Sequence, residues 1–183
     1  MMTLHTTQLQ SRARELCAGE RVLLSGPVYT ARDAAHKRLC ALLDEKKLLP
    51  FELSGACVYY AGPTPMPPGR VIGSCGPTTS GRMDVYTPRL LAHGLSAMIG
   101  KGGRDEAVCR AVAEHGAVYF CAVGGAGALA AQCVTACEEI AFHDLGCESI
   151  KRLELLNFPL VVGVDAAGNS LFAGEKQPPD KQI

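Results

Sequence analysis

The chain has 183 residues, of which 48% are hydrophobic and 20% are charged, and its formal net charge is zero. This length and composition are typical of one globular domain with a hydrophobic core, so we expect a single domain over residues 1–183. Because basic residues are not in excess and aromatic residues are few, the sequence favours a small anionic ligand and argues against nucleic acid as a partner.

Residues 1–23 contain several charged side chains and no apolar core, so they do not have the pattern of a secretion signal. The stretch 117–137 carries no charge, but glycines interrupt it, and a strand, a turn and a buried helix explain it better than a membrane span. These glycines could offer backbone N–H groups to an anion or allow close helix packing. We expect a cytoplasmic protein without a membrane partner.

The first clear element is the apolar run 21–24, which predicts a strand. The Gly-Pro pair at 26–27 predicts a turn after it. A helical pattern over 31–47 follows, with Thr30 as the expected N-cap and Asp33 at the capping-box position.

Arg32 then falls in the first helical turn, where free backbone N–H groups and the helix dipole favour an anion. A role in covering the surface is the alternative. His36 lies one turn further along and could pair with Asp33 across the helix face. We expect Asp33 and His36 to support the site, and a structural role is favoured for His36.

Residues 56–61 predict a second strand, and the proline-rich loop 62–69 after it suggests a hinge or a partner-facing segment. The most informative segment is 74–84. Its glycines and proline predict a loop, and Thr78 to Ser80 supply three consecutive hydroxyls. Arg82 adds a planar fork that matches a carboxylate or phosphate, so this loop is typical of an anion site.

Residues 99–104 read Ile-Gly-Lys-Gly-Gly-Arg, which places Lys101 between glycines. Glycine lets the backbone approach a bound group while the ammonium acts on it as a point charge. The spacing of a phosphate-binding P-loop is absent.

Further along, helical patterns cover 105–115 and 127–141, and apolar runs at 117–123 and 160–164 predict strands. The alternation of elements predicts an α/β domain with a mostly parallel sheet flanked by helices. The polar stretch 175–183 is expected to be a flexible tail.

Nine cysteines are present, but no Cys-x-x-Cys pair occurs, and only Cys133 and Cys137 are close, at helical spacing. This spread argues for buried thiols in a reducing compartment and against a metal or cluster site within the chain. Cys75 borders the hydroxyl-rich loop and could be reachable by thiol reagents, although packing is the favoured explanation.

Taken together, these segments resemble the C-terminal, or beta-subunit, domain of the class I iron–sulfur fumarase and L-tartrate dehydratase family. The resemblance covers nearly the whole chain. It rests on the motifs Gly-Pro-x-Tyr-Thr-Ala-Arg-Asp-Ala-Ala-His at 26–36, Tyr-Ala-Gly-Pro-Thr-Pro at 60–65, Gly-Pro-Thr-Thr-Ser-Gly-Arg-Met-Asp at 76–84, Ile-Gly-Lys-Gly at 99–102, the stretch 115–127 and Phe-Pro at 158–159.

The resemblance implies a swivelling β/β/α domain, with a second small sheet layer beside the central sheet. It also implies a hydro-lyase that adds water to a C4 dicarboxylate or removes it, with fumarate and malate as the expected pair. The [4Fe-4S] cluster would be held by a partner alpha subunit, in a heterodimer or an α2β2 assembly. The catalytic cleft would then lie at the interface, and the isolated chain could form a homodimer.

By the same resemblance, Arg32, Arg82 and Lys101 are ligands of the substrate carboxylates. Thr78 is the candidate base that removes the proton from carbon, and Thr79 is a substrate-binding residue and the rival for the role of base. A threonine hydroxyl is a weak base, so this role requires activation by nearby cations or by the partner.

Two alternatives stay open. An L(+)-tartrate dehydratase beta subunit would act on a substrate that differs by a hydroxyl group. A non-catalytic anion-binding or carrier domain would need no iron and could use His36 as a phosphate carrier, which requires an accessible histidine.

Overall fold

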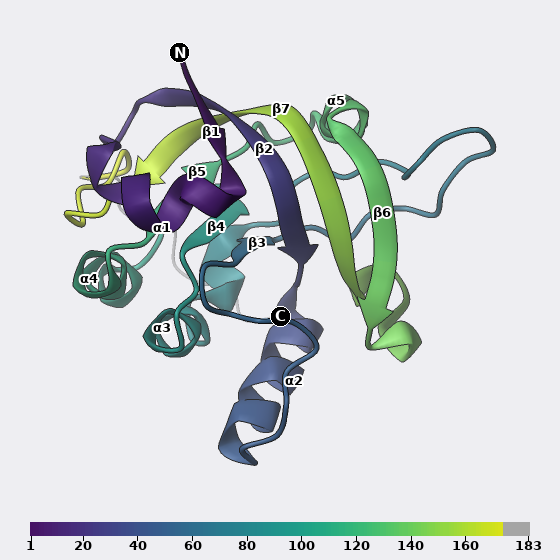
Figure 1. Cartoon of the computed structure of the whole chain (residues 1–183), viewed down its shortest axis with the longest axis horizontal. Coiled ribbons are helices and arrows are strands. Elements are labelled where there is room, and N and C mark those ends of the chain that lie inside the picture. Colours follow the sequence, from purple (N-terminus) through teal and green to yellow (C-terminus); the bar gives the residue numbers. More distant parts are fainter. Residues whose placement is uncertain (174–183) are drawn as a thin grey trace.

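The computed structural model describes residues 1–173 and shows a mixed α/β fold built around one seven-stranded sheet (Figure 1). The strand order is β1-β2-β3-β4-β5-β7-β6, and β2 also pairs with β7. The strands are β1 (Met2–His5), β2 (Arg21–Thr30), β3 (Cys57–Tyr59), β4 (Ala97–Gly100), β5 (Val118–Cys121), β6 (Val134–Ala141) and β7 (Ile150–Val164).

The helices are α1 (Leu9–Arg12), α2 (Asp33–Asp44), α3 (Thr87–Ala92), α4 (Glu106–His115) and α5 (Gly127–Gln132). Short 3₁₀ helices are η1 (Thr6–Gln8), η2 (Ala13–Glu15), η3 (Ser80–Met83) and η4 (His143–Glu148). Within residues 1–173, no helix has the length and apolar character needed to cross a membrane. The tail predicted at 175–183 lies outside the described residues.

Strands β1 to β5 pair in parallel, whereas β7 runs antiparallel to β2, β5 and β6. The 15-residue strand β7 pairs with β2 along one edge, and along the other it pairs first with β6 and then with β5. The predicted α/β class is therefore confirmed, with a sheet whose parallel part is β1 to β5.

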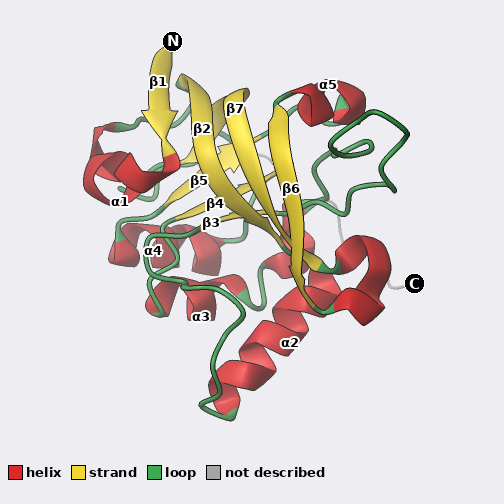
Figure 2. Cartoon of the chain, turned by 45° about the vertical axis from the view of Figure 1, so that its right-hand side comes forward, coloured by secondary structure: helices red, strands yellow, loops and turns green. Residues whose placement is uncertain are grey.

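Strands β3, β4 and β5 are buried on both faces, because alternate side chains enter two separate hydrophobic clusters. One face packs against residues of β1, β2 and β7, and the other packs against α2, α3 and α4. Figure 2 shows the three helices together on one side of the sheet. Burial on both faces explains why these strands read as continuous apolar runs in the sequence.

Several local predictions were wrong, each because pairing with a distant strand overrides the local signal. The Gly-Pro pair at 26–27 is not a turn; β2 continues through it, with a register shift between Leu24 and Gly26 and φ of +104° at the glycine. Glycine therefore marks a bulge here. Thr30 is not the N-cap of α2, since it ends β2 and its Oγ1 donates to the Ser149 carbonyl and accepts from Lys151 N–H.

The helix predicted over 127–141 ends at Gln132, and β6 follows it from Val134. Residues 134–141 pair with β7, so tertiary pairing decides their conformation. Cys133 and Cys137 consequently do not share a helix face. The strand predicted at 21–24 is confirmed as the start of β2, and the runs 56–61 and 117–123 contain the shorter strands β3 and β5. The helix predicted at 105–115 is confirmed as α4.

Candidate active site

The predicted substrate ligands and the candidate base lie on segments that leave the carboxyl ends of β2, β3 and β4. Arg32 and Asp33 follow β2, the loop 76–84 comes after β3, and Lys101 follows β4 directly. Because these three strands are neighbours and parallel, their carboxyl ends meet at one edge of the sheet. Ligand sites of open α/β sheets form at this edge.

Backbone pairing holds the loop 76–84 against the sheet. Thr78 N–H donates to the Tyr60 carbonyl at 2.6 Å, and Ser80 N–H donates to the Lys101 carbonyl at 3.0 Å. Thr79 and Lys101 also form a parallel β-bridge. The structure thus brings the hydroxyl-rich segment and Lys101 side by side.

The carboxylate of Asp33 lies between two arginines. Arg82 Nε is 2.8 Å from Asp33 Oδ1, and Arg32 Nη2 is 3.9 Å from Asp33 Oδ2. The side chain of Arg82 is 51% exposed, and neither of its Nη atoms pairs with another side chain of residues 1–173. This geometry holds the guanidinium at Nε and leaves its outer fork open for a bidentate anion.

Arg32 has a second carboxylate partner that the sequence did not indicate. Glu148 Oε1 is 3.3 Å from Arg32 Nη2, and Glu148 Oε2 accepts the Ala34 N–H at the start of α2. Gly62 permits this arrangement, since a Cβ there would lie 3.1 Å from Arg32 Cδ. Arg32 itself is the N-cap of α2, and its side chain makes no capping bond. Because Glu148 is 116 residues away in sequence, no local motif could reveal it.

The other predicted residues lie at the surface. Thr78 and Lys101 are partly exposed and Thr79 is exposed. Within residues 1–173 the Thr78 hydroxyl makes no hydrogen bond to a protein atom, and the Lys101 ammonium has no carboxylate within 4 Å. The glycine turn lies next to the lysine, since a Cβ on Gly124 would be 3.4 Å from Lys101 Cδ. Thr78 therefore has no activating base among the described residues.

Gly127 serves close packing. Its carbonyl accepts the Cys75 N–H at 3.0 Å, and a Cβ on Gly76 would lie 3.3 Å from Gly127 Cα. Of the two roles considered for the glycine stretch, close backbone approach is the one that the structure shows at this position.

His36 is fully buried and does not pair with Asp33, which corrects that prediction. Its Nδ1 donates to the Arg32 carbonyl at 2.9 Å, and its Nε2 has no partner. The ring packs against those of Tyr60 and Tyr86, with ring centroids 5.3 and 6.0 Å away. Burial lowers the pKa of His36 to about 4, so the ring is neutral near pH 7. A carrier histidine must be accessible, so the proposal that His36 carries phosphate was wrong.

Behind the site lies a buried ion pair that the sequence did not reveal. The Arg104 side chain is 0% exposed; its Nε is 2.7 Å from Asp84 Oδ1, and its Nη2 donates to Thr87 Oγ1 at 2.7 Å. Its guanidinium also lies over the rings of Tyr60 and Tyr119. Arg104 therefore anchors the end of the loop 76–84 and takes no part in the exposed cationic surface.

Cys75 is buried, and burial raises the pKa of its thiol to about 12, so reaction with thiol reagents is disfavoured. Within residues 1–173, no group of three or more His, Cys, Asp or Glu side chains could hold a metal ion.

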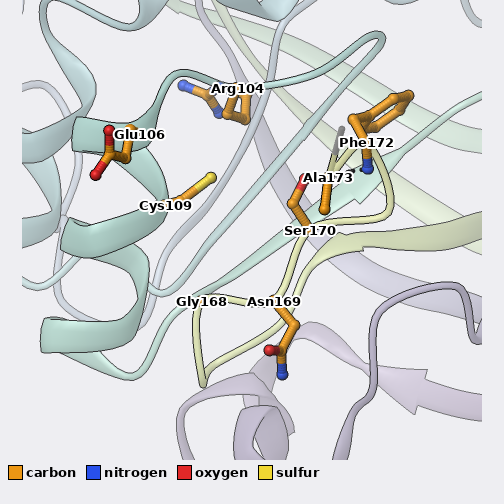
Figure 3. Close-up of a pocket in the computed structure, with 8 residues that line it drawn as sticks. All are labelled: Arg104, Glu106, Cys109, Gly168, Asn169, Ser170, Phe172 and Ala173. Atoms are coloured by element: carbon orange, nitrogen blue, oxygen red, sulfur yellow. Dashed lines mark hydrogen bonds between the residues drawn. The ribbon is translucent and has the colours of Figure 1, made fainter. Parts of the chain in front are cut away.

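A separate cavity of about 540 Å³ lies between the start of α4 and the turn that follows β7 (Figure 3). It is lined by Arg104, Glu106, Cys109, Gly168, Asn169, Ser170, Phe172 and Ala173. None of the predicted site residues is among them. The cationic residues thus belong to the exposed edge of the sheet and not to this cavity.

Comparison with known proteins gives matches along most of the chain. The family model described as fumarase C-terminus matches residues 1–175. The anaerobic class I fumarate hydratase of Escherichia coli is 42% identical over 154 residues, which are 83% of this chain and 28% of that protein. The mitochondrial fumarate hydratase 1 of Leishmania major is 40% identical, with the same coverage of 83% and 28%.

A protein of Methanocaldococcus jannaschii, provisionally named L(+)-tartrate dehydratase subunit beta, is 39% identical over 165 residues. Here the match covers 87% of this chain and 85% of that protein. The chain therefore spans about 28% of the length of the fumarate hydratases it matches, but most of the length of the tartrate dehydratase subunit.

Proposed function

The chain belongs to the fumarase C-terminus family, and from this premise we propose that it is the beta subunit of a hydro-lyase that reversibly hydrates a C4 dicarboxylate. Fumarate and malate are the proposed substrate and product, because several relatives are named fumarate hydratases of class I. We further propose that the chain is one cytoplasmic domain with the swivelling β/β/α fold. Two hydrophobic clusters on opposite faces of β3 to β5 support this layered description.

The observation that carries the proposal is the convergence of three segments far apart in the sequence. Arg82 reaches Asp33 at 2.8 Å, and Ser80 N–H reaches the Lys101 carbonyl at 3.0 Å. A dicarboxylate needs cations at both ends, and Arg32, Arg82 and Lys101 would supply them around one surface.

The reaction requires a base near the C–H bond that breaks and donors for the charge that develops on the carboxylate. In this proposal Thr78 takes the proton and Thr79 binds the substrate. Within residues 1–173 the hydroxyl of Thr78 has no hydrogen-bond partner, so in this proposal its activation comes from the nearby cations or from the partner subunit. Asp33 holds Arg82 at Nε, which orients the outer fork of the guanidinium toward a carboxylate.

We propose that the [4Fe-4S] cluster belongs to a partner alpha subunit; in support, no group of three or more His, Cys, Asp or Glu side chains within residues 1–173 could hold a metal ion. The matched part makes up only 28% of the matching fumarate hydratase of Escherichia coli, whereas it makes up 85% of the matching tartrate dehydratase subunit. A separate alpha subunit, in a heterodimer or α2β2 assembly, would complete the active site.

An L(+)-tartrate dehydratase beta subunit is the second candidate. The specific observation in its favour is the match over 85% of a protein given that name. The two substrates differ by hydroxyl substitution, and groups from both subunits would have to discriminate between them.

The test is the anaerobic loss of fumarate absorbance, measured with this chain purified together with its cluster-bearing partner. Activity should require both subunits. Thr78→Ala should lower kcat by about 10²-fold or more, as expected for loss of a general base, with thermal stability unchanged. Thr79→Ala is the matched control, and we expect it mainly to raise KM. A complex with an intact cluster that acts on tartrate but not on fumarate would favour the second candidate, and an active Thr78→Ala variant would exclude Thr78 as the base.

A further inference from the structure

The two loops that carry the proposed base and the proposed lysine ligand are joined from beneath by one side chain. Tyr119 lies in β5 and is fully buried. Its hydroxyl is 2.8 Å from Ser80 Oγ and 2.8 Å from the Gly102 carbonyl oxygen. Ser80 belongs to the loop 76–84, and Gly102 follows Lys101.

The chemistry of the groups fixes the direction of both hydrogen bonds. A carbonyl oxygen only accepts, and a phenol has one proton, so Tyr119 donates to Gly102 and Ser80 donates to Tyr119. Burial raises the pKa of the Tyr119 phenol far above its usual range, so the phenol keeps its proton near neutral pH. Ser80, Tyr119 and Gly102 together form what we call the hydroxyl bridge.

Close packing leaves this bridge little room to rearrange. A Cβ on Gly100 would overlap the Ser80 hydroxyl, so the serine oxygen lies directly over the backbone of β4. Ser80 itself is 0% exposed, whereas its neighbour Thr79 is exposed. The loop therefore has a buried anchor at residue 80 and presents its other hydroxyls outward.

On the basis of the function proposed above, we propose that Tyr119 is a positioning residue, whose hydroxyl holds the Thr78-Thr79 segment in register with Lys101. Without it, the two loops would keep only their backbone pairing at this point, which is the bridge between Thr79 and Lys101 with its Ser80 N–H to Lys101 carbonyl bond. A misplacement of about 1 Å between reacting groups can lower a rate by about 10²-fold. The arginines would keep their places, because Asp33 and Glu148 hold them independently.

Tyr60 offers a matched control. It is also 0% exposed, and its ring also lies over the Arg104 guanidinium. Its hydroxyl, however, contacts Thr87 Oγ1 and Arg104 Nη1 at 3.3 Å each, and it touches neither Ser80 nor Gly102. Tyr60→Phe and Tyr119→Phe thus remove the same atom from similar environments, and only the second removes the bridge.

Two measurements test the proposal. In the assembled enzyme, Tyr119→Phe should lower kcat for the dicarboxylate about tenfold or more and change KM less than about threefold, while Tyr60→Phe keeps kcat within about twofold of wild type. In the isolated chain, hydrogen exchange of the Ser80 amide should accelerate about tenfold in Tyr119→Phe and stay unchanged in Tyr60→Phe. Ser80→Ala should give a smaller fall in kcat, and the double variant should be no worse than Tyr119→Phe.

Equal effects of the two tyrosine substitutions on kcat would overturn the proposal. So would faster exchange of the Ser80 amide in Tyr119→Phe without a loss of kcat. A loss of kcat without faster exchange would overturn it as well. If Tyr119→Phe does not fold, as judged by circular dichroism, Ser80→Ala decides the question by the same two measurements. A third outcome is possible: the assembled wild-type complex is inactive, while the Ser80 amide of the isolated chain still exchanges faster in Tyr119→Phe. This outcome would refute the proposed hydro-lyase function and the catalytic role of the bridge. The bridge would then stand only as a link between the loops.

Discussion

Removing the carboxylate of Asp84 should destabilise this chain severely. The Arg104 guanidinium is completely buried, and Asp84 is the acidic partner that neutralises it, with Nε 2.7 Å from Oδ1. The second oxygen of Asp84 accepts the Asp105 N–H at 2.8 Å. In Asp84→Ala, the guanidinium would keep its bonds to Thr87 and Tyr60 but would have no counter-charge.

An uncompensated buried charge of this kind costs about 3–5 kcal/mol. Whole domains are stable by only about 5–15 kcal/mol, so the variant should lose a large part of its free energy of unfolding. For a chain of this size, that loss corresponds to a fall in Tm of about 6–20 °C. Asp84→Asn, which retains an acceptor but not the charge, should lie between wild type and Asp84→Ala.

Urea unfolding followed by circular dichroism, with linear extrapolation to water, measures the difference. The control is Asp44→Ala, which breaks an exposed pair with Arg89 of similar length, 2.6 Å. An exposed pair is solvated and screened, so this variant should unfold nearly as wild type does. If Asp84→Ala shifts the unfolding midpoint no more than Asp44→Ala does, Asp84 is not the essential counter-charge of Arg104.

Three further outcomes are expected. Burial lowers the pKa of His36 from 6.5 to about 4. Between these pH values the unfolded chain therefore binds a proton at His36 that the folded chain does not. The free energy of unfolding should keep its full value above about pH 6.5 and fall by about 3 kcal/mol as the pH drops to 4. Urea unfolding of wild type and His36→Phe at pH 7 and 4.5 checks this, and an equal pH dependence in both would contradict it. At pH 8 a thiol reagent should label the exposed Cys147 rapidly and the buried Cys75 hardly at all. Peptide mass spectrometry measures the two labelling rates, and similar rates would contradict this prediction. Gly100→Ala should lower Tm and activity, since its Cβ overlaps the serine hydroxyl above it and overpacking costs about 1–3 kcal/mol. Gly81→Ala, which meets no atom within 4 Å, should leave Tm nearly unchanged in thermal denaturation.

The comparison between the sequence and the fold shows where local signals are reliable. The helix α4 was predicted within one residue, because Asp105 caps it with a bond to Val108 N–H and Gly116 ends it in the left-handed region. The segment 134–141 was predicted as helix and is a strand. Its conformation depends on pairing with β7, a partner that the local pattern does not contain.

In the candidate site, too, some features could be predicted from the sequence and others depend on the tertiary structure. The hydroxyls of residues 78–80 and the cations at Arg82 and Lys101 could be identified from the sequence, because a glycine-rich loop with these side chains is a local feature. Their closeness to one another was only implied by a resemblance. The parallel order of β2, β3 and β4 now accounts for it, since it brings their carboxyl ends to one edge.

The sequence by itself therefore determined the inventory of the site: which donors, cations and flexible turns are present, and at what spacing along each loop. The tertiary structure alone decided which groups meet. It paired Arg32 with Glu148, buried His36 and Arg104, and placed Tyr119 beneath the two loops. The physical reason is range: turn and cap preferences act over a few residues, whereas burial and ion pairing depend on neighbours that the sheet brings together from distant parts of the chain.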